Sequence, residues 1–245
     1  MSARSTLATA GRVLTQLRHD HRTIALVLVV PSVLVTLLRY LFDGQPETFD
    51  RVAGPMLGLF PFLIMFLITS ITMLRERTSG TLERLMTMPI AKLDLLGGYA
   101  IAFALLAAAQ AAVVSAVAFW LLGLDVAGSP TTVIGLAVAN AVLGMALGLL
   151  VSAFAATEFQ AVQFMPAIVL PQLLLCGLFV PRERMAEALE VASDFLPLTY
   201  AFEALQAVTE DGAAVGDLGL EIGVVAGATV LALVLGASTL RRRTA

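Results

Sequence analysis

The sequence predicts an all-α integral membrane protein with six transmembrane helices, and composition and span length carry this prediction. Hydrophobic residues make up 59% of the 245-residue chain and charged residues only 13%, whereas soluble domains carry about 25% charged residues. A chain this apolar has too little polar surface to face water, so the bilayer is expected to be its solvent.

Six apolar stretches are long enough to cross the hydrocarbon core, which takes about 20 residues of helix. We place them at residues 23–42, 52–74, 93–122, 131–156, 159–180 and 217–240. The first is not expected to be a signal peptide, because it is long and no small-x-small cleavage site follows it. The third exceeds the length of a span, so it is expected to tilt or to project into water.

The distribution of basic residues predicts the orientation. With both termini in the cytoplasm, 11 of the 15 Lys and Arg residues fall inside, and only Arg39, Arg51, Arg182 and Arg184 fall outside. This satisfies the positive-inside rule. Arginine is used far more than lysine, as is typical of GC-rich bacteria, so we expect a multi-pass protein of the bacterial plasma membrane.

Residues 4–22 predict an N-terminal amphipathic helix in the membrane interface. Its apolar face is expected to comprise Leu7, Ala10, Val13, Leu14 and Leu17. The opposite face is expected to carry Arg4, Arg12, Arg18 and Arg22. Two interpretations stay open: a topological anchor, or a lever that also contacts a cytoplasmic partner.

Two segments between the spans have helical character of their own. In the cytoplasmic loop 75–92, Gly80 ends the incoming helix, Thr81 can cap a short new helix with Glu83 in its first turn, and Pro89 stops it. A solvated loop that only fixes topology is the alternative. Outside, residues 181–211 predict two short helices that re-enter the outer leaflet, because backbone at membrane depth must be buried in protein or line a cavity.

Several chemistries are excluded by the residues themselves. Lys92 is the only lysine and stands between Ala91 and Leu93, so there is no P-loop and the chain is not expected to be an enzyme. No carboxylate lies deep in a span, which argues against proton coupling. Cys176 is the only cysteine, and both histidines, His19 and His21, lie outside the spans. No bound cofactor, metal or nucleic acid is therefore expected.

Two sequence blocks resemble the ABC type-2 exporter permeases. The first is RERTSGTLERLMTMPI at 75–90, with the Arg-Glu-Arg opening, the Gly-Thr-Leu-Glu core and the Pro-Ile end. The second is FLPLTYAFEALQAVTEDG at 195–212, preceded by the GLFVP step at 177–181. One departure is Gln206, where these permeases often have Arg. The resemblance covers nearly the whole chain.

The resemblance implies that two permease subunits, identical or different, pair in the membrane and that each sits on a separate ABC ATPase, which binds ATP and Mg²⁺. It makes residues 4–22 a connecting helix and residues 181–211 the external segment that closes the exit, including Pro181, Pro197, Tyr200 and Glu203. The ATPase-coupling residues it implies are Arg75, Glu76, Arg77, Gly80, Thr81, Leu82, Glu83, Arg84 and Pro89.

The resemblance also places spans two and five opposite each other across a two-fold axis, which suggests a translocation pathway. Span two presents a stripe of Phe62, Met65, Phe66, Thr69 and Met73. Span five presents Gln163, Ala167 and Leu170, with Pro166 beside them. Such surfaces can accept varied apolar guests, but ordinary packing between spans or against lipid is the alternative.

The expected function is therefore export of an amphipathic or lipid-like substrate, such as a drug, antibiotic, lipid or glycolipid. A secondary transporter or channel that works alone, and a membrane assembly protein without transport activity, are the alternatives. The residues do not identify the substrate.

Overall fold

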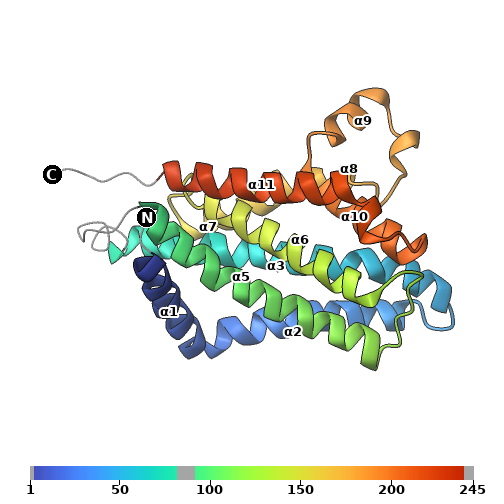
Figure 1. Ribbon diagram of the computed structural model, residues 1–245, viewed down its shortest axis with the longest axis horizontal. Coiled ribbons are helices and arrows are strands. Elements are labelled where there is room, and N and C mark those ends of the chain that lie inside the picture. The colour runs from blue at the N-terminus through green and yellow to red at the C-terminus, as the bar shows by residue number, and fades with distance from the viewer. Residues whose placement is uncertain (1–2, 82–91, 240–245) are drawn as a thin grey trace.

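The computed structural model describes residues 3–81 and 92–239, and within these ranges the chain is helical with no strand. Figure 1 shows long helices side by side in an elongated bundle. The short helix α9 protrudes near one end, and α1 crosses the opposite end at a steep angle to the other helices.

Among the described residues, six helices are long and apolar enough to cross a membrane, which confirms the predicted fold class. The described helices before the external segment are α1 Ala3–His19, α2 His21–Leu41, α3 Pro46–Thr78, α5 Lys92–Ala116 with its π-helical continuation η1 Val117–Leu121, and α6 Pro130–Val151. The fifth span consists of α7 Glu158–Phe164, the π-helix η2 Met165–Val169 and α8 Leu170–Leu175. The last span is α11 Gly219–Ser238.

Several spans differ in length from the predicted apolar stretches: the fourth ends at Val151 instead of residue 156, and the last covers 219–238 instead of 217–240. Helix α3 has 33 residues because Pro46 starts it well before the apolar run, and its polar last turn continues to Thr78. The fifth span is shorter than 159–180 and ends at Leu175. Gly177 follows with a φ of +98°, a left-handed conformation that glycine adopts without strain. The chain turns there towards the external segment.

The external segment contains the short helices that the sequence predicted between 181 and 211. The 3-10 turn η3 Arg182–Arg184 and helix α9 Glu187–Ser193 are followed by α10 Pro197–Glu210. Helix α10 packs against α3, α6 and α11, and its buried residues include Leu198, Phe202 and Leu205. Another 3-10 turn, η4 Val215–Asp217, leads into α11.

The tightest helix pair is α3 with α6, and two glycines of α6 make it possible. A Cβ atom on Gly144 would lie 2.3 Å from the carbonyl oxygen of Phe62, and one on Gly148 would lie 2.4 Å from that of Phe66. Small residues four positions apart let the backbones of membrane helices approach closely. The core of the bundle therefore forms along α3.

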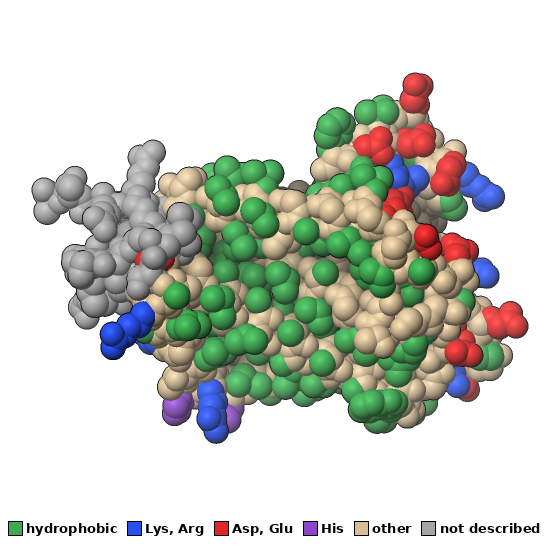
Figure 2. Space-filling model, in the orientation of Figure 1, with side chains coloured by type: hydrophobic (Ala, Val, Ile, Leu, Met, Phe, Trp, Pro, Cys, Tyr) green, Lys and Arg blue, Asp and Glu red, His purple; other side chains and the backbone are tan. Residues whose placement is uncertain are grey.

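The surface fits a protein that crosses a membrane. Figure 2 shows hydrophobic side chains spread over the middle of the molecule, while acidic side chains gather at the end that carries α9. Arginine and histidine side chains appear towards the opposite end, near α1. This separation agrees with the orientation predicted from the sequence, which stays a prediction.

Candidate functional site

Helix α1 packs along α5 through a face of small and aliphatic residues. Thr9, Ala10, Val13 and Leu17 are its buried residues, and Gly98 of α5 has no room for a side chain because a Cβ atom there would lie 2.5 Å from Thr9. Of the predicted apolar face, Ala10, Val13 and Leu17 are therefore buried within the chain, whereas Leu7 is 62% exposed. The location of α1 in the membrane interface stays a prediction.

The sequence pattern placed Arg12 with the other arginines on the face opposite the apolar one, but in the structure Arg12 contacts α5 and α3. It donates a hydrogen bond to the Tyr99 hydroxyl of α5, and its guanidinium carbon lies 5.5 Å from the centre of the Tyr99 ring. Its Nη1 is also 3.6 Å from the Glu76 carboxylate of α3, which is only 5% exposed. These contacts join α1, α3 and α5 at one point.

The last turn of α3 makes two further connections. Arg75 donates two hydrogen bonds to the Glu158 carboxylate of α7, at 2.7 and 2.9 Å. Arg77 donates from Nη2 to the Thr239 hydroxyl just after α11, at 3.3 Å. The three charged residues at the start of the predicted coupling segment therefore contact other helices of the same chain.

The remainder of that segment is described only at its start. Gly80 has a φ of +73° and follows the end of α3, as predicted. The hydroxyls of Ser79 and Thr81 are hydrogen-bonded at 3.0 Å. Leu82, Glu83, Arg84 and Pro89, which the sequence analysis assigned to ATPase coupling, lie outside the described residues.

The proposed pathway stripe of α3 is part of the core. The side chains of Phe62, Met65, Phe66, Thr69 and Met73 are all 0% exposed. Thr69 donates to the carbonyl oxygen of Met65 at 2.6 Å and approaches that of Met145 in α6 at 3.2 Å. These residues fit the alternative interpretation, ordinary packing between spans, because the glycines of α6 bring its backbone against this stripe.

The corresponding stripe of the fifth span lies on the surface. Gln163, Pro166 and Ala167 are exposed, and Leu170 is 42% exposed. Pro166 lies within the π-helical segment η2, where its missing N–H and its ring disturb the regular helix. The structure therefore does not bring the two predicted stripes together within one chain.

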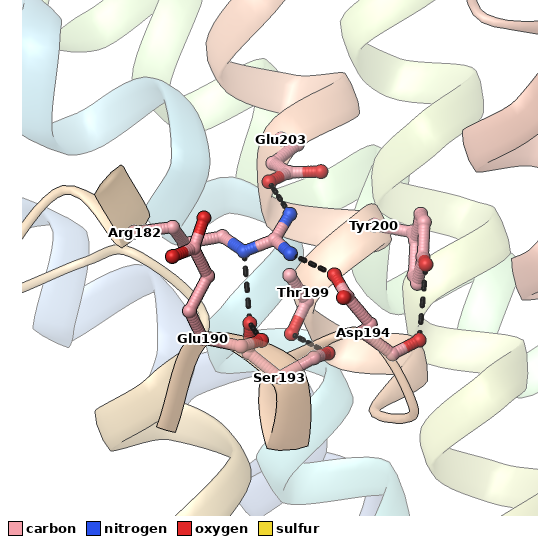
Figure 3. A network of polar contacts seen from close by, with 7 residues as sticks. All are labelled: Arg182, Glu190, Ser193, Asp194, Thr199, Tyr200 and Glu203. Carbon is pink, nitrogen blue, oxygen red and sulfur yellow. Dashed lines mark hydrogen bonds and ion pairs between the residues drawn. The ribbon is translucent and has the colours of Figure 1, made fainter. Parts of the chain in front are cut away.

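Arg182 is the centre of a polar network in the external segment (Figure 3). Its guanidinium forms ion pairs with Glu203 of α10 and with Asp194 after α9, and its Nε donates to the Ser193 hydroxyl at 2.9 Å. Burial alone would lower the pKa of Arg182, but Glu203 and Asp194 outweigh this and raise it. The network holds the loop and α9 against α10.

Two further hydrogen bonds reinforce the same contact. Thr199 donates to the Ser193 carbonyl oxygen at 2.9 Å, and Tyr200 donates to that of Asp194 at 3.0 Å (Figure 3). The sequence pattern pointed to Glu203 and Tyr200 but not to Arg182, which pairs with Glu203. The available signal was an arginine directly after Pro181 in a segment rich in acidic residues.

Comparison with known proteins identifies the family. The ABC-2 type transporter family profile matches residues 5–209. The linearmycin resistance permease protein LnrN of Bacillus subtilis is 24% identical over 220 residues, covering 87% of this chain and 55% of that protein. The probable multidrug ABC transporter permease YbhR of Escherichia coli is 28% identical over 134 residues, covering 55% and 36% of the two chains.

A eukaryotic protein is also similar. ABC transporter G family member 20 of Dictyostelium discoideum is 26% identical over 171 residues, which cover 69% of this chain and 23% of that protein. The aligned regions thus span about half or less of the length of these relatives. The family match covers most of the present chain, including the first sequence block and most of the second, so the chain belongs to the ABC-2 type transporter family.

Proposed function

We propose that this chain is the permease subunit of an exporter driven by a separate ABC ATPase, to which residues 75–90 dock. The observation that carries the proposal is the set of contacts at the end of α3. Glu76 contacts α1, Arg75 contacts α7, and Arg77 contacts the end of α11. A force applied to the segment after α3 would therefore act on α1, α3, α7 and the end of α11 together.

These contacts support a division of roles among the proposed coupling residues. Arg75, Glu76 and Arg77 position the end of α3 within the permease, and the residues after Gly80 are left to contact the ATPase. The Arg75–Glu158 pair is exposed, with 61% and 52% of the two side chains accessible, so water and salt screen it and it stabilises the contact little. The buried Glu76 is the stronger connection, because removing its partner would leave a buried charge unpaired.

The substrate is proposed to be an amphipathic molecule, as the names of two relatives suggest. One relative is named for linearmycin resistance and the other for multidrug transport. A second permease subunit would cover the exposed stripe of the fifth span, which includes Gln163 and Leu170. Two ATPase copies would then bind one permease pair on its cytoplasmic side.

Crosslinking tests the docking segment. Single cysteines at positions 79–86 are expected to crosslink to the co-expressed ATPase, and Arg84→Glu is expected to separate ATP hydrolysis from transport while the protein still inserts. Glu183→Ala in the external segment is the matched control and is expected to leave coupling intact. Substrate transport by the permease alone, without ATPase or ATP, would contradict the proposal.

The orientation has its own test. Cysteines that replace Asp125 and Glu187 are expected to react with a membrane-impermeant reagent on intact cells. Cysteines that replace Lys92 and Arg242 are expected to react only after the membrane is opened. Labelling of position 92 from outside would place the docking segment on the wrong side for an ATPase.

A further inference from the structure

The junction between α1 and α2, residues 18–22, gathers exposed basic side chains, and we call it the elbow. Arg18 lies in the last turn of α1 and Arg22 in the first turn of α2, and both are exposed, as are His19 and His21. Neither arginine forms an ion pair with another residue of the described part of the chain. Figure 2 shows arginine and histidine side chains projecting from the end of the molecule that carries α1.

The acidic residue inside the elbow is already engaged. Both carboxylate oxygens of Asp20 accept hydrogen bonds from Thr23, one from its backbone N–H at 3.1 Å and one from its hydroxyl at 2.6 Å. Asp20 also lines a cleft between α1, α2 and α3 together with Arg75. Arg18 and Arg22 are not among the residues that line this cleft. The carboxylate therefore caps α2, and the two guanidinium groups are left to the surroundings of the molecule.

The surroundings of Arg22 are indicated by the rest of α2. Leu26, Val29, Val33 and Leu37 follow Arg22 at spacings of four, three, four and four residues, which places all five side chains on one face of the helix. The four apolar side chains are 47–58% exposed, so in a span this face meets acyl chains. Since a helix rises 1.5 Å per residue, Arg22 lies about 6 Å beyond Leu26, where acyl chains give way to headgroups.

The outward face of α1 continues this surface. Arg4, Leu7, Gly11 and Arg18 fall on one side of the helix and are exposed, and Leu7 is 62% exposed. Figure 1 shows α1 at a steep angle to α2, so this face runs across the end of the bundle. A helix face with arginines at its ends and an apolar residue between them is typical of helices in the headgroup region of a membrane.

We propose that the elbow binds an anionic phospholipid of the inner leaflet, with its phosphate against Arg18 and Arg22 and its acyl chains along the exposed stripe of α2. Guanidinium groups bind phosphate through paired hydrogen bonds, and an anionic leaflet attracts basic residues at its surface. A zwitterionic headgroup would bring an ammonium group next to two arginines. A cytosolic protein would meet the same arginines, but it would not explain why they continue into a lipid-facing stripe.

The test uses the full-length chain in nanodiscs of phosphatidylcholine. Cys176 is buried, so a fluorophore can be attached selectively to Ala25→Cys, at an exposed position near Arg22. Phosphatidylglycerol or phosphatidylcholine, each with the same nitroxide-labelled chain, is then added as the quencher. Phosphatidylglycerol is expected to quench at a lower mole fraction, by about fivefold for each arginine.

Variants identify the residues responsible. The double variant Arg18→Gln/Arg22→Gln is expected to remove the preference for phosphatidylglycerol, whereas Arg18→Lys/Arg22→Lys keeps the charges and is expected to retain most of it. Arg184→Gln, at an exposed arginine of the external segment, is the control and is expected to change nothing. Trp120 is an internal control, because it is the only tryptophan, is 84% exposed and lies in η1 at the other end of α5. Its fluorescence is expected to be quenched equally by both lipids.

The unmodified elbow provides a second measurement if the glutamine variant does not insert. Salt screens exposed charges, so the preference at position 25 is expected to fall as sodium chloride is raised. Equal quenching by the two lipids, a preference that salt does not change, or a preference that persists in the glutamine variant would overturn the proposal. Both leaflets of a nanodisc carry the same lipids, so the result does not depend on the predicted orientation, and a failure here would leave the proposed export function untouched.

Discussion

Replacing Gly144 by alanine tests whether the middle of α3 is packing surface or pathway. The new Cβ atom would lie 2.3 Å from the Phe62 carbonyl oxygen and 2.9 Å from its carbon. Both atoms are backbone, which cannot turn aside as a side chain can. Because ordinary contacts begin near 3.4 Å, the two helices must part locally by about 1 Å.

Gly135 of the same helix is the matched control, because nothing lies within 4 Å of the Cβ atom that alanine would add there. Alanine is favoured over glycine inside a helix by about 0.5–1 kcal/mol, and this gain applies to both variants. Their difference therefore isolates the clash at Gly144. Overpacking of this kind costs about 1–3 kcal/mol, so Gly144→Ala is expected to be less stable than Gly135→Ala by that amount.

The measurement is the free energy of unfolding in mixed micelles, obtained by titrating a folded sample with denaturing detergent. Both variants are compared with the unmodified chain at the same detergent composition. Equal unfolding free energies for the two variants would refute the close contact of α3 with α6. The stripe from Phe62 to Met73 would then be free to face a cavity, as the sequence analysis suggested.

Three other outcomes are expected. Arg182→Gln should make α9 more sensitive to an added protease, because the ion pair to α10 is lost. Arg184→Gln, at the neighbouring exposed arginine, should not have this effect, and equal cleavage of the two variants would contradict the role of the network. Phe66→Ala, at a buried side chain, should lower the free energy of unfolding by about 3–5 kcal/mol. Gln163→Ala, at an exposed side chain, should lower it by less than about 0.5 kcal/mol. A similar loss in both variants would show that Phe66 and Gln163 do not differ in burial. Asp20 accepts hydrogen bonds from Thr23, which hold its pKa below its usual value. Asp20→Ala should therefore lower the free energy of unfolding by about 1 kcal/mol above pH ~4, and by progressively less as the pH falls through the lowered pKa of Asp20. A loss of stability that does not change with pH would exclude this cap.

The six spans could be predicted because a run of about 20 apolar residues is a strong signal that needs no knowledge of tertiary contacts. The ends of the helices could not be predicted in the same way. Hydropathy marks where lipid begins, whereas a helix ends where its backbone hydrogen bonds end. Helix α3 thus continues to Thr78 through Arg75 and Arg77, although its apolar stretch stops before them.

The candidate site was predictable in position but not in pairing. The periodicity of residues 4–22 predicted one helix, whereas α1 ends at His19 and Arg22 belongs to α2. A pattern along one helix contains no information about Glu76 of another, so the contact between Arg12 and Glu76 could not be predicted. The buried stripe of α3 had a signal that was not used. Gly144 and Gly148 are four residues apart in an apolar helix, a spacing typical of close helix contacts, and it would have predicted packing at Phe62 and Phe66.

Helix α3 connects the two ends of the molecule because small residues bring other helices against it along its length. In its N-terminal third, a Cβ atom on Gly54 would lie 2.5 Å from Thr209 of α10, and in its middle the glycines of α6 contact its backbone. Near its C-terminal end Glu76 contacts Arg12. Helix α10 in turn carries Glu203, which holds Arg182 and the external segment. Close packing transmits displacement because it leaves no slack between neighbours, so a movement of the segment after Thr78 and a movement of the external segment are mechanically linked through one helix.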